Sequence, residues 1–327
     1  MQISSDADER DGPIPSPRNQ AMLVKAATLY YLEGKSQAEV AEEIGVSRSN
    51  VSRVLADARK NGIVDIRIND PFGRARDLES QLVARYGLRE CRVAPSTGSD
   101  NQLSRVGALG AQWLLDNLPR EGGVALSWGS SVQAVVDEIP DDASHENIEV
   151  LPLVGGLSIV DSARDGNVLV RLLATKLGAQ HRRLYAPAVV ESRESREAFL
   201  GESSITGVLD ASRRAKIAIV GVGNVGRGAS GAIIESMNLS RSEQAEFTAS
   251  GAVGDCCTRF FDRNGKTVES TVNDRVIAID LEELGKIPTV VGIAAGAHKM
   301  EGTHAALTGG LFDVLVVDSD LALSLLN

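Results

Sequence analysis

A short segment near the N-terminus, residues 36–62, constrains the fold more than any other part of the chain. Ser36 and Glu39 have the spacing of a capping box, in which the serine accepts the glutamate's backbone N–H and the glutamate reaches back to the serine's own N–H. Gly45 suits the left-handed conformation that ends a helix, and Ser47 can cap the next helix. Two capped helices joined at a glycine predict a helix-turn-helix unit.

The second helix of this unit, which Asn61-Gly62 ends, has an apolar face of valine, leucine and alanine and a polar face of serine and arginine. Such a helix enters the major groove of DNA, where its first turns reach base edges. Arginine pairs with guanine, asparagine with adenine, and serine commonly binds phosphate. The alternative is a three-helix module whose polar face only meets water. The residues expected to contact DNA are Gln37, Ser47, Arg48, Ser49, Asn50, Ser52 and Arg53.

Charge is distributed unevenly along the chain, whose formal net charge is −10. Residues 18–69 hold eight basic and six acidic residues, whereas residues 1–17 hold four acidic and one basic residue. Most of the negative charge therefore lies beyond residue 69. Because lysine and arginine contacts with phosphate dominate the affinity for DNA, double-stranded operator DNA is an expected partner of the N-terminal module only.

Three regions are expected in a chain of 327 residues, which exceeds one typical domain. Residues 1–19 are acidic and contain proline, so they indicate a disordered leader rather than a signal peptide. Residues 20–70 form an all-α helix-turn-helix domain, with a first helix over residues 20–32 and an alternating segment, residues 63–68, that would add a short strand and make the domain winged. Residues 71–327 form the effector and oligomerisation domain.

Membrane insertion, disulfides and metal binding are not indicated. No apolar run approaches the roughly 20 residues that span a bilayer, so a cytoplasmic protein without membrane contact is expected. The three cysteines, Cys91, Cys256 and Cys257, are odd in number and lack CxxC spacing. We expect buried thiols, no metal and no cofactor.

The larger region alternates apolar strand candidates with amphipathic helices, which predicts an α/β fold with a mostly parallel sheet covered by helices on both faces. Asn264-Gly265 between extended flanks predicts a hairpin over residues 260–268. The expected helices are 73–86, 102–118, 167–177 and 303–309, and the expected strands are 91–94, 124–127, 148–154, 183–185, 217–220, 276–279, 289–293 and 314–317.

Three glycine-rich turns follow strands of this sheet, at residues 126–131, 153–156 and 219–223. At such turns, free backbone N–H groups and the dipole of the next helix can hold an anion, and glycine allows close approach. Open α/β sheets place ligands at these strand ends. Each turn alone can be merely structural, but together they indicate a pocket.

Several segments together resemble the SorC family of sugar-responsive bacterial regulators, over about residues 22–326. The resemblance implies a Rossmann-like body similar to glucosamine-6-phosphate and ribose-5-phosphate isomerases, and a phosphorylated sugar or polyol as effector. The segments that carry it are AEEIGVSRSNVSRVLADARKNGIV, SWGSS, LVGGL, LYAP, GVGNVG, GAVGDCCTRFFDRNG and GAHKMEGTHAALTGGLFDVLVVDSD.

Carried across, the resemblance implies that the effector phosphate binds at Gly129, Ser130 and Ser131. It places sugar hydroxyls near Gly155, Gly156, Gly221, Gly223, Asp255 and Lys299. The chain departs from the family's usual residues at Ser130 and Ser131, where threonine is common, and at Ala297 and Thr303-His304. Lys299 can also be a solvated lysine, and Asp255 can simply cap a turn.

Two other functions compete with this interpretation. Residues 221–226 match GxGxxG after a strand, which is typical of dinucleotide binding. However, the run that follows is too glycine-rich to begin a firm helix, and no acid lies at the expected spacing. A sugar-phosphate isomerase would need an acid and a base, for which Asp255 with His298 or His304 are candidates.

A helix-turn-helix head has little reason to accompany an isomerase, so a regulator of a carbohydrate catabolic operon, and not an enzyme, is expected. We expect a homo-oligomer, a dimer or tetramer, that places two heads on the half-sites of a palindrome. The effector would then favour one arrangement of the heads, either releasing or tightening the DNA.

Overall fold

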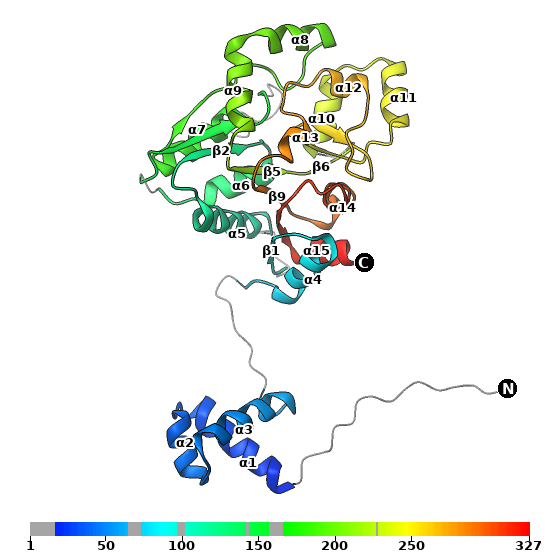
Figure 1. Cartoon of the computed structure of the whole chain (residues 1–327). Coiled ribbons are helices and arrows are strands. Elements are labelled where there is room, and N and C mark those ends of the chain that lie inside the picture. The colour runs from blue at the N-terminus through cyan, green and yellow to red at the C-terminus, as the bar shows by residue number, and fades with distance from the viewer. Residues whose placement is uncertain (1–16, 65–72, 97–101, 142–143, 157–165, 227) are drawn as a thin grey trace, which may run out of the picture. The chain divides into compact units, whose positions relative to one another are not determined.

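The computed structural model describes residues 17–64, 73–96, 102–141, 144–156, 166–226 and 228–327 (Figure 1). It divides into an N-terminal unit, residues 1–69, and a C-terminal unit, residues 70–327, which are described separately. Most of the expected leader and the core of the expected wing strand, residues 65–68, lie outside the described residues. Helix α1 (Pro17–Ala27) begins inside the expected leader, with a proline at the first helical position, where its missing N–H costs nothing.

The N-terminal unit is a bundle of helices around a small apolar core. Helix α1 continues through a π-helical turn, η1 (Thr28–Leu32), and is followed by α2 (Gln37–Ile44) and α3 (Arg48–Lys60). The predicted apolar face of α3 is confirmed, because Val51, Val54, Leu55 and Ala58 are all buried. The core consists of Leu23, Ala26, Ala27, Leu29, Val40, Ala41, Val51, Val54, Leu55 and Ala58.

The predicted helix ends of this unit are confirmed. Ser36 and Glu39 form the reciprocal capping box at the start of α2, and Gly45 ends the helix in the left-handed conformation, with φ +74°. Ser47 accepts the Asn50 N–H at 3.3 Å and so begins α3. These local bonds satisfy backbone groups that the helices leave unpaired.

The C-terminal unit is built on a seven-stranded parallel sheet with the order β1-β10-β9-β5-β2-β3-β4, which confirms the predicted α/β class. From β2 the chain proceeds through β3 to the edge strand β4. From β5 it proceeds through β9 to β10, toward the other edge, which β1 forms. The direction therefore reverses between β2 and β5, the place where such sheets bind ligands. The strands are β1 (Glu90–Ala94), β2 (Gly122–Leu126), β3 (Ile148–Pro152), β4 (Gln180–His181), β5 (Ile217–Gly221), β9 (Val290–Ala294) and β10 (Val314–Asp318).

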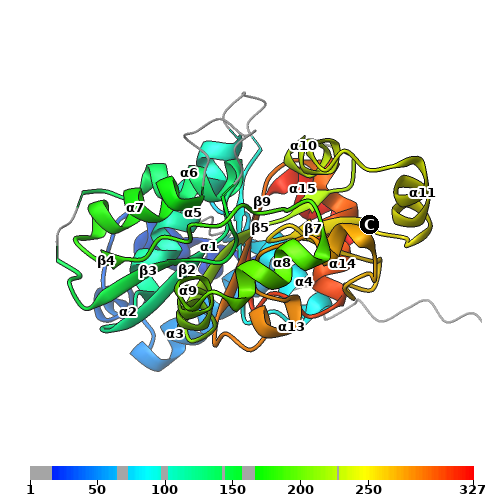
Figure 2. The same cartoon turned by 90° about the horizontal axis from the view of Figure 1, so that it is seen from above.

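Helices cover both faces of this sheet, and Figure 2 shows α7 and α9 on opposite sides of β2 and β3. Neighbouring strand residues separate accordingly: Ile219 packs in the cluster under α5, α6 and α7, whereas Val220 packs in the cluster on the opposite face. The longer helices are α4 (Arg76–Tyr86), α5 (Gln102–Asn117), α6 (Ser130–Glu138), α7 (Gly166–Leu177), α8 (Arg193–Gly201), α9 (Ser203–Arg213), α10 (Gly228–Ser236), α11 (Arg241–Ala249), α14 (Met300–Thr308) and α15 (Ser319–Leu326). Three short turns complete them: α12 (Thr271–Asp274), α13 (Leu281–Leu284) and the 3-10 turn η3 (Ala297–Lys299).

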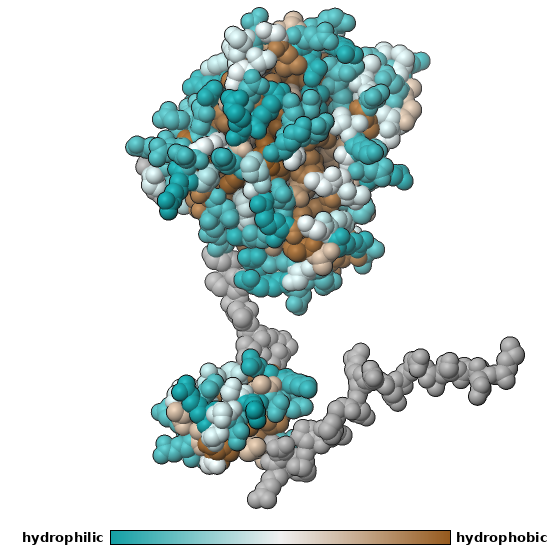
Figure 3. Space-filling model, in the orientation of Figure 1, coloured by the Kyte–Doolittle hydropathy of each residue, from teal (hydrophilic) through white to brown (hydrophobic). Residues whose placement is uncertain are grey.

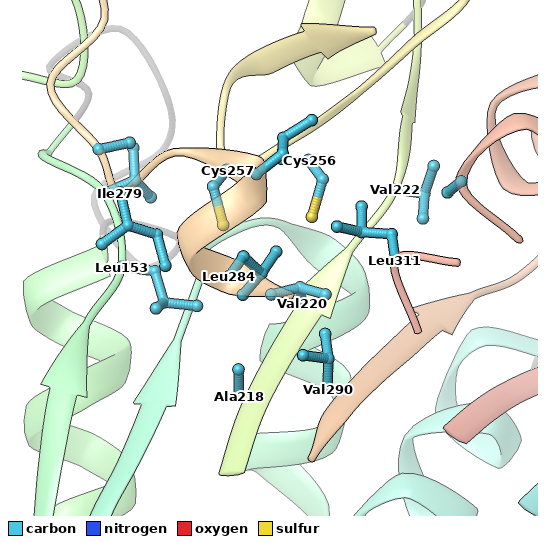
Figure 4. Packing of buried hydrophobic residues seen from close by; sticks show 14 of the residues in the cluster. Leu153, Ala218, Val220, Val222, Cys256, Cys257, Ile279, Leu284, Val290 and Leu311 are labelled. Atoms are coloured by element: carbon cyan, nitrogen blue, oxygen red, sulfur yellow. The ribbon is translucent and has the colours of Figure 1, made fainter. Parts of the chain in front are cut away.

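The cysteines lie in or beside this core, as predicted. Figure 4 shows Cys256 and Cys257 close to Val220 and Leu284, in the cluster that also contains Ala218 and Val290. All three cysteines of the chain are unpaired and buried. They behave as small hydrophobic residues, which is the usual role of a buried free thiol.

Two expected strands, residues 183–185 and 276–279, are wrong. Leu184 is buried, but its backbone N–H and C=O pair with the side chain of Asn167 instead of a strand. Residues 276–279 cross the sheet end and make only isolated bridges, although Ile277 and Ile279 are fully buried. The apolar residues in both segments are there because the segments are buried. A sequence pattern alone cannot distinguish such a buried segment from a strand that is hydrogen-bonded into a sheet.

A second, antiparallel sheet lies beyond the main one and consists of β6 (Gly223–Asn224), β7 (Gly254–Cys256) and β8 (Arg259–Phe261). The expected Asn264-Gly265 turn is present, with Gly265 at φ +75° and a bridge between Phe261 and Thr267 closing it. The tighter hairpin, between β7 and β8, was not predicted.

No helix in the described part of the chain is long and apolar enough to cross a membrane, and the face drawn in Figure 3 is mainly hydrophilic.

Candidate functional site

The residues expected to contact DNA gather at the start of α2 and along the first turns of α3. Gln37 is half-buried, and the other six, from Ser47 to Arg53, are exposed. Within the described residues, neither Arg48 nor Arg53 forms an ion pair, in contrast to Lys35, which lies between Glu33 and Glu43. An unpaired arginine on an exposed helix face is available for phosphate or base edges.

A cavity of about 190 Å³ lies at the carboxyl ends of β2 and β5, where the sheet connections reverse direction. We call it the strand-end cavity. Seven of the nine residues expected to bind the effector line it: Gly129, Ser130, Ser131, Gly221, Gly223, Asp255 and Lys299.

One wall of the cavity is the N-terminus of α6. Gly129 has φ +115° and supplies no side-chain cap, and the first bond of the helix runs from the Gln133 N–H to the Gly129 carbonyl. The N–H groups of the first helical turn, at Ser130 and Ser131, therefore have no helical acceptor. Free N–H groups combined with the positive end of the helix dipole favour an anion at this wall.

Gly155 and Gly156 do not line the cavity, where Val154 takes their place. Their N–H groups are occupied, since Gly155 donates to the Ile277 carbonyl at 3.0 Å and Gly156 to the Ala186 carbonyl at 2.9 Å. A β-carbon at Gly155 would overlap the backbone of the 186–187 segment. In this structure these glycines serve close packing of backbone segments.

The opposite wall centres on Asp255, which is 8% exposed. Asp255 pairs with Gly223 across β6 and β7, and Ser230 of α10 donates its hydroxyl to the Asp255 Oδ1 atom. A β-carbon at Gly223 would overlap both of these oxygens, so only glycine fits there. Burial raises the pKa of Asp255, while the Ser230 bond, the Lys299 charge and the Thr258 N–H act against that rise.

Lys299 reaches between the two walls. Its Nζ donates to Ser131 Oγ at 3.3 Å. Burial lowers the pKa of Lys299, and the nearby Asp255 charge opposes that shift. The lysine loop is held by Asn224, which donates to the His298 carbonyl and accepts the Gly302 N–H at 3.0 Å. Lys299 is thus a positioned, partly desolvated cation rather than a freely solvated one.

Sequence reasoning missed four polar residues of this cavity. Ser127 accepts the Gly221 N–H at 3.2 Å and so ties the end of β2 to the end of β5. Asn224 fixes the lysine loop, Ser230 holds Asp255, and Thr258 lines the cavity. All four lie within or beside the glycine-rich motifs, but the partners of Ser127, Asn224 and Ser230 are far away in sequence, so spacing gave no signal for their roles.

The geometry separates the two histidines named for an isomerase. His298 lines the cavity together with Asp255, whereas His304 lies outside the lining, with its Nδ1 2.8 Å from the Tyr86 hydroxyl. The GxGxxG run leads from β5 into β6 before α10 begins, although a helix does start at Gly228, in the run expected to be too glycine-rich to begin a firm one. Among the described residues no group of three or more His, Cys, Asp or Glu could hold a metal ion.

Comparison with known proteins agrees with both units. Residues 70–327 match the sugar-binding domain family, and residues 27–61 match region 4 of sigma-70. The sorbitol operon regulator of Klebsiella pneumoniae is 31% identical over 314 residues, covering 94% of this chain and 98% of that protein. The deoxyribonucleoside regulator of Bacillus subtilis (strain 168) is 30% identical over 313 residues, with the same coverage of 94% and 98%.

Solved structures give the same result. The crystal structure of the full-length sorbitol operon regulator SorC from Klebsiella pneumoniae matches with a TM-score of 0.72 at 30% identity, covering 95% of this chain and 100% of that one. These relatives are regulators, not enzymes. The resemblance found in the sequence is therefore confirmed, and the chain belongs to the SorC family of sugar-binding transcriptional regulators.

Proposed function

We propose that this regulator controls a carbohydrate catabolic operon by binding a small phosphorylated sugar or polyol in the strand-end cavity. The observation that carries the proposal is the pairing of opposite polar walls in one small cavity. The free amides of α6 lie on one side, the Asp255 carboxylate on the other, and Lys299 lies between them. A ligand that fits needs an anionic end and a hydroxyl-bearing end.

The phosphate end is assigned to Gly129, Ser130 and Ser131. Three features favour an anion there: the uncapped helix N-terminus, the serine hydroxyls and the Lys299 ammonium 3.3 Å from Ser131 Oγ. A carboxylate would satisfy the same donors less completely, because a phosphate has three terminal oxygens to share among them.

The sugar end is assigned to Asp255, with Gly221 and Gly223 allowing close approach. A buried carboxylate that already accepts the Ser230 hydroxyl has acceptor sites left for further donors. Sugar and polyol hydroxyls are donors of the right kind. For Gly155 and Gly156 we propose only an indirect role, in holding the neighbouring wall.

The DNA-binding role is assigned to residues 20–70, and the effector and oligomerisation roles to residues 71–327. We propose that Gln37, Ser47, Arg48, Ser49, Asn50, Ser52 and Arg53 contact operator DNA in the cytoplasm. We also propose that the protein forms a dimer or tetramer, so that two heads meet the half-sites of a palindrome. The ligand can change operator affinity only if it binds one arrangement of the two heads more tightly than another.

A thermal-shift screen tests the ligand assignment. The full-length protein is heated with hexose and pentose monophosphates, with the same sugars and polyols lacking phosphate, and with inorganic phosphate. A ligand at about 100 times its dissociation constant adds about 2.7 kcal/mol of stability, so one or more sugar or polyol phosphates should raise the melting temperature clearly. Equal shifts from the unphosphorylated sugars would contradict the phosphate assignment.

A further inference from the structure

The hairpin turn between β7 and β8 has an unusual backbone. Its two central residues, Cys257 and Thr258, have φ angles of +53° and +65°. Two consecutive left-handed residues make a tight hairpin turn that normally uses glycine, asparagine or aspartate. For a β-branched threonine this conformation is a genuine outlier, and such strain concentrates at binding sites.

The Thr258 side chain also has an unsatisfied hydroxyl. Thr258 is 2% exposed, and its Oγ1 atom is buried without a hydrogen-bond partner among the described residues. The residue lines the strand-end cavity. A buried hydroxyl without a partner is unfavourable, and in the wall of a cavity a bound ligand can supply that partner.

The position of this hydroxyl relates it to Asp255. Thr258 is a central residue of the turn, Asp255 lies three residues earlier in β7, and the Thr258 N–H hydrogen-bonds to the Asp255 side chain. Asp255 can only accept hydrogen bonds when ionised, whereas a threonine hydroxyl can both donate and accept. Together they offer a neighbouring pair of groups suited to two adjacent hydroxyls, or to a hydroxyl and a ring oxygen.

We propose that Thr258 is a specificity-determining residue, whose hydroxyl binds an oxygen of the effector beside the hydroxyl that Asp255 accepts. The proposal rests on the proposed function, because it takes the occupant of the cavity to be a polyhydroxylated phosphate. It adds a contact to the sugar part of the ligand, which is the part that differs from one sugar phosphate to another. It adds no contact to the phosphate.

The test measures ligand affinity of the full chain by calorimetry for wild type and Thr258→Val, which keeps the branched shape but removes the hydroxyl. The probes are inorganic phosphate and the hexose or pentose monophosphate that binds wild type best. We expect the affinity for the sugar phosphate to fall about three- to tenfold, the loss of one hydrogen bond, while the affinity for inorganic phosphate stays the same. Thr258→Ser should stay within about twofold of wild type, since it keeps the hydroxyl.

Thr303 provides a matched control. Its hydroxyl is also buried without a hydrogen-bond partner in the described part of the chain, but the residue does not line the cavity. Thr303→Val should therefore leave both affinities unchanged. Thr258→Gly is a second variant in case valine does not fold in this turn, because glycine adopts positive φ freely. It should melt no lower than wild type and lose the same affinity.

The affinities for monodeoxy analogues of the same sugar phosphate distinguish a direct contact from a purely structural role of Thr258. Wild type should discriminate against one of them, and Thr258→Val should not. Unchanged sugar-phosphate affinity in Thr258→Val and Thr258→Gly would overturn the role of Thr258 and leave the proposed function intact. Failure of every sugar phosphate to bind wild type would overturn both.

Discussion

The two functional surfaces of this regulator differ in how their residues reach the site. In the N-terminal unit, the expected DNA contacts come from one short stretch, residues 37–53, and nearly all are exposed. In the strand-end cavity, the polar groups come from segments between Ser127 and Lys299, and several are buried. The first surface is a product of local helix geometry, whereas the second exists only once the sheet is complete.

The electrostatic consequences of this difference are opposite. Arg48 and Arg53 meet their partner in solvent, so their contribution should weaken with salt as counterions are released. Asp255 is buried, Lys299 is half-buried, and each shifts the other's pKa, so the cavity should respond to pH more than to salt. Four predictions test this contrast, in order of expected effect.

Ser130→Asp should have the largest effect. A carboxylate at the first position of α6 would face the ligand phosphate, and like charges in close contact cost several kcal/mol, so sugar-phosphate affinity should fall about a hundredfold or more. Operator affinity without ligand should be unchanged. Ser203→Asp, the same substitution at the N-terminus of α9, is the control and should bind ligand normally. Calorimetry measures both, and normal binding by Ser130→Asp would exclude this wall as the phosphate site.

Arg53→Ala should weaken operator binding by about 1–3 kcal/mol, or roughly 5- to 150-fold, if it contacts a base edge or phosphate. Sugar-phosphate affinity should not change. Arg59→Ala, in the last turn of the same helix, is exposed but lies away from the expected base contacts and should lose much less. Fluorescence anisotropy with labelled operator DNA at two salt concentrations measures this. Equal losses in both variants would mean that α3 does not enter the groove by its first turns.

Asp255→Asn should change how stability depends on pH. Burial raises the native pKa of Asp255, so the native protein holds a proton that the unfolded chain releases from about pH 4 upward. The free energy of unfolding of wild type should therefore fall, relative to Asp255→Asn, as pH rises from the unfolded to the native pKa. The slope cannot exceed about 1.4 kcal/mol per pH unit for one group.

Asp262 provides a control of opposite sign for this pH effect. Desolvation raises its pKa somewhat, but backbone N–H bonds from Lys266 and Asn264 outweigh that effect and leave the pKa lowered. The contribution of Asp262 is therefore present above its unfolded pKa and lost as pH falls. Urea unfolding of Asp255→Asn and Asp262→Asn across the pH range measures the slopes. Parallel slopes for the two variants would contradict the burial of Asp255.

Ser36→Ala should have the smallest effect, about 1 kcal/mol, because it removes the capping box of α2. Ser240→Ala removes the matching box of α11 in the C-terminal unit. Hydrogen exchange should become faster in α2 for the first variant and in α11 for the second, with no change in the other helix. Faster exchange throughout the chain for either variant would show that the two units do not open independently.

Sequence reasoning succeeded where the cause is local. The Ser36 box, the Gly45 turn and the apolar face of α3 each depend on neighbours within a few residues, so spacing alone specified them. It failed where distant segments decide the outcome. Leu184 reads as a strand residue because it is buried, yet the Asn167 side chain takes the hydrogen bonds of a strand partner.

The cavity shows the same limit. The glycine turns correctly predicted a pocket at the carboxyl ends of the strands, and the family resemblance predicted that Asp255 and Lys299 belong to it. However, the distinction between Gly223, which faces the cavity, and Gly155, which packs against backbone, depends on contacts that only the fold creates. The bonds from Asn224 to the lysine loop likewise join residues with no recognisable spacing, and no sequence pattern indicated that the Thr258 hydroxyl would be buried without a partner among the described residues.

The coupling between the two surfaces is tested most directly by one titration on the wild-type protein. The dissociation constant for labelled DNA from the promoter of its own operon is measured with and without a saturating sugar phosphate, and the ligand affinity is measured with and without that DNA. We expect a change of about 5- to 150-fold in operator affinity and an equal factor in ligand affinity, as linkage requires. A ligand that binds the cavity and leaves operator affinity unchanged would contradict it.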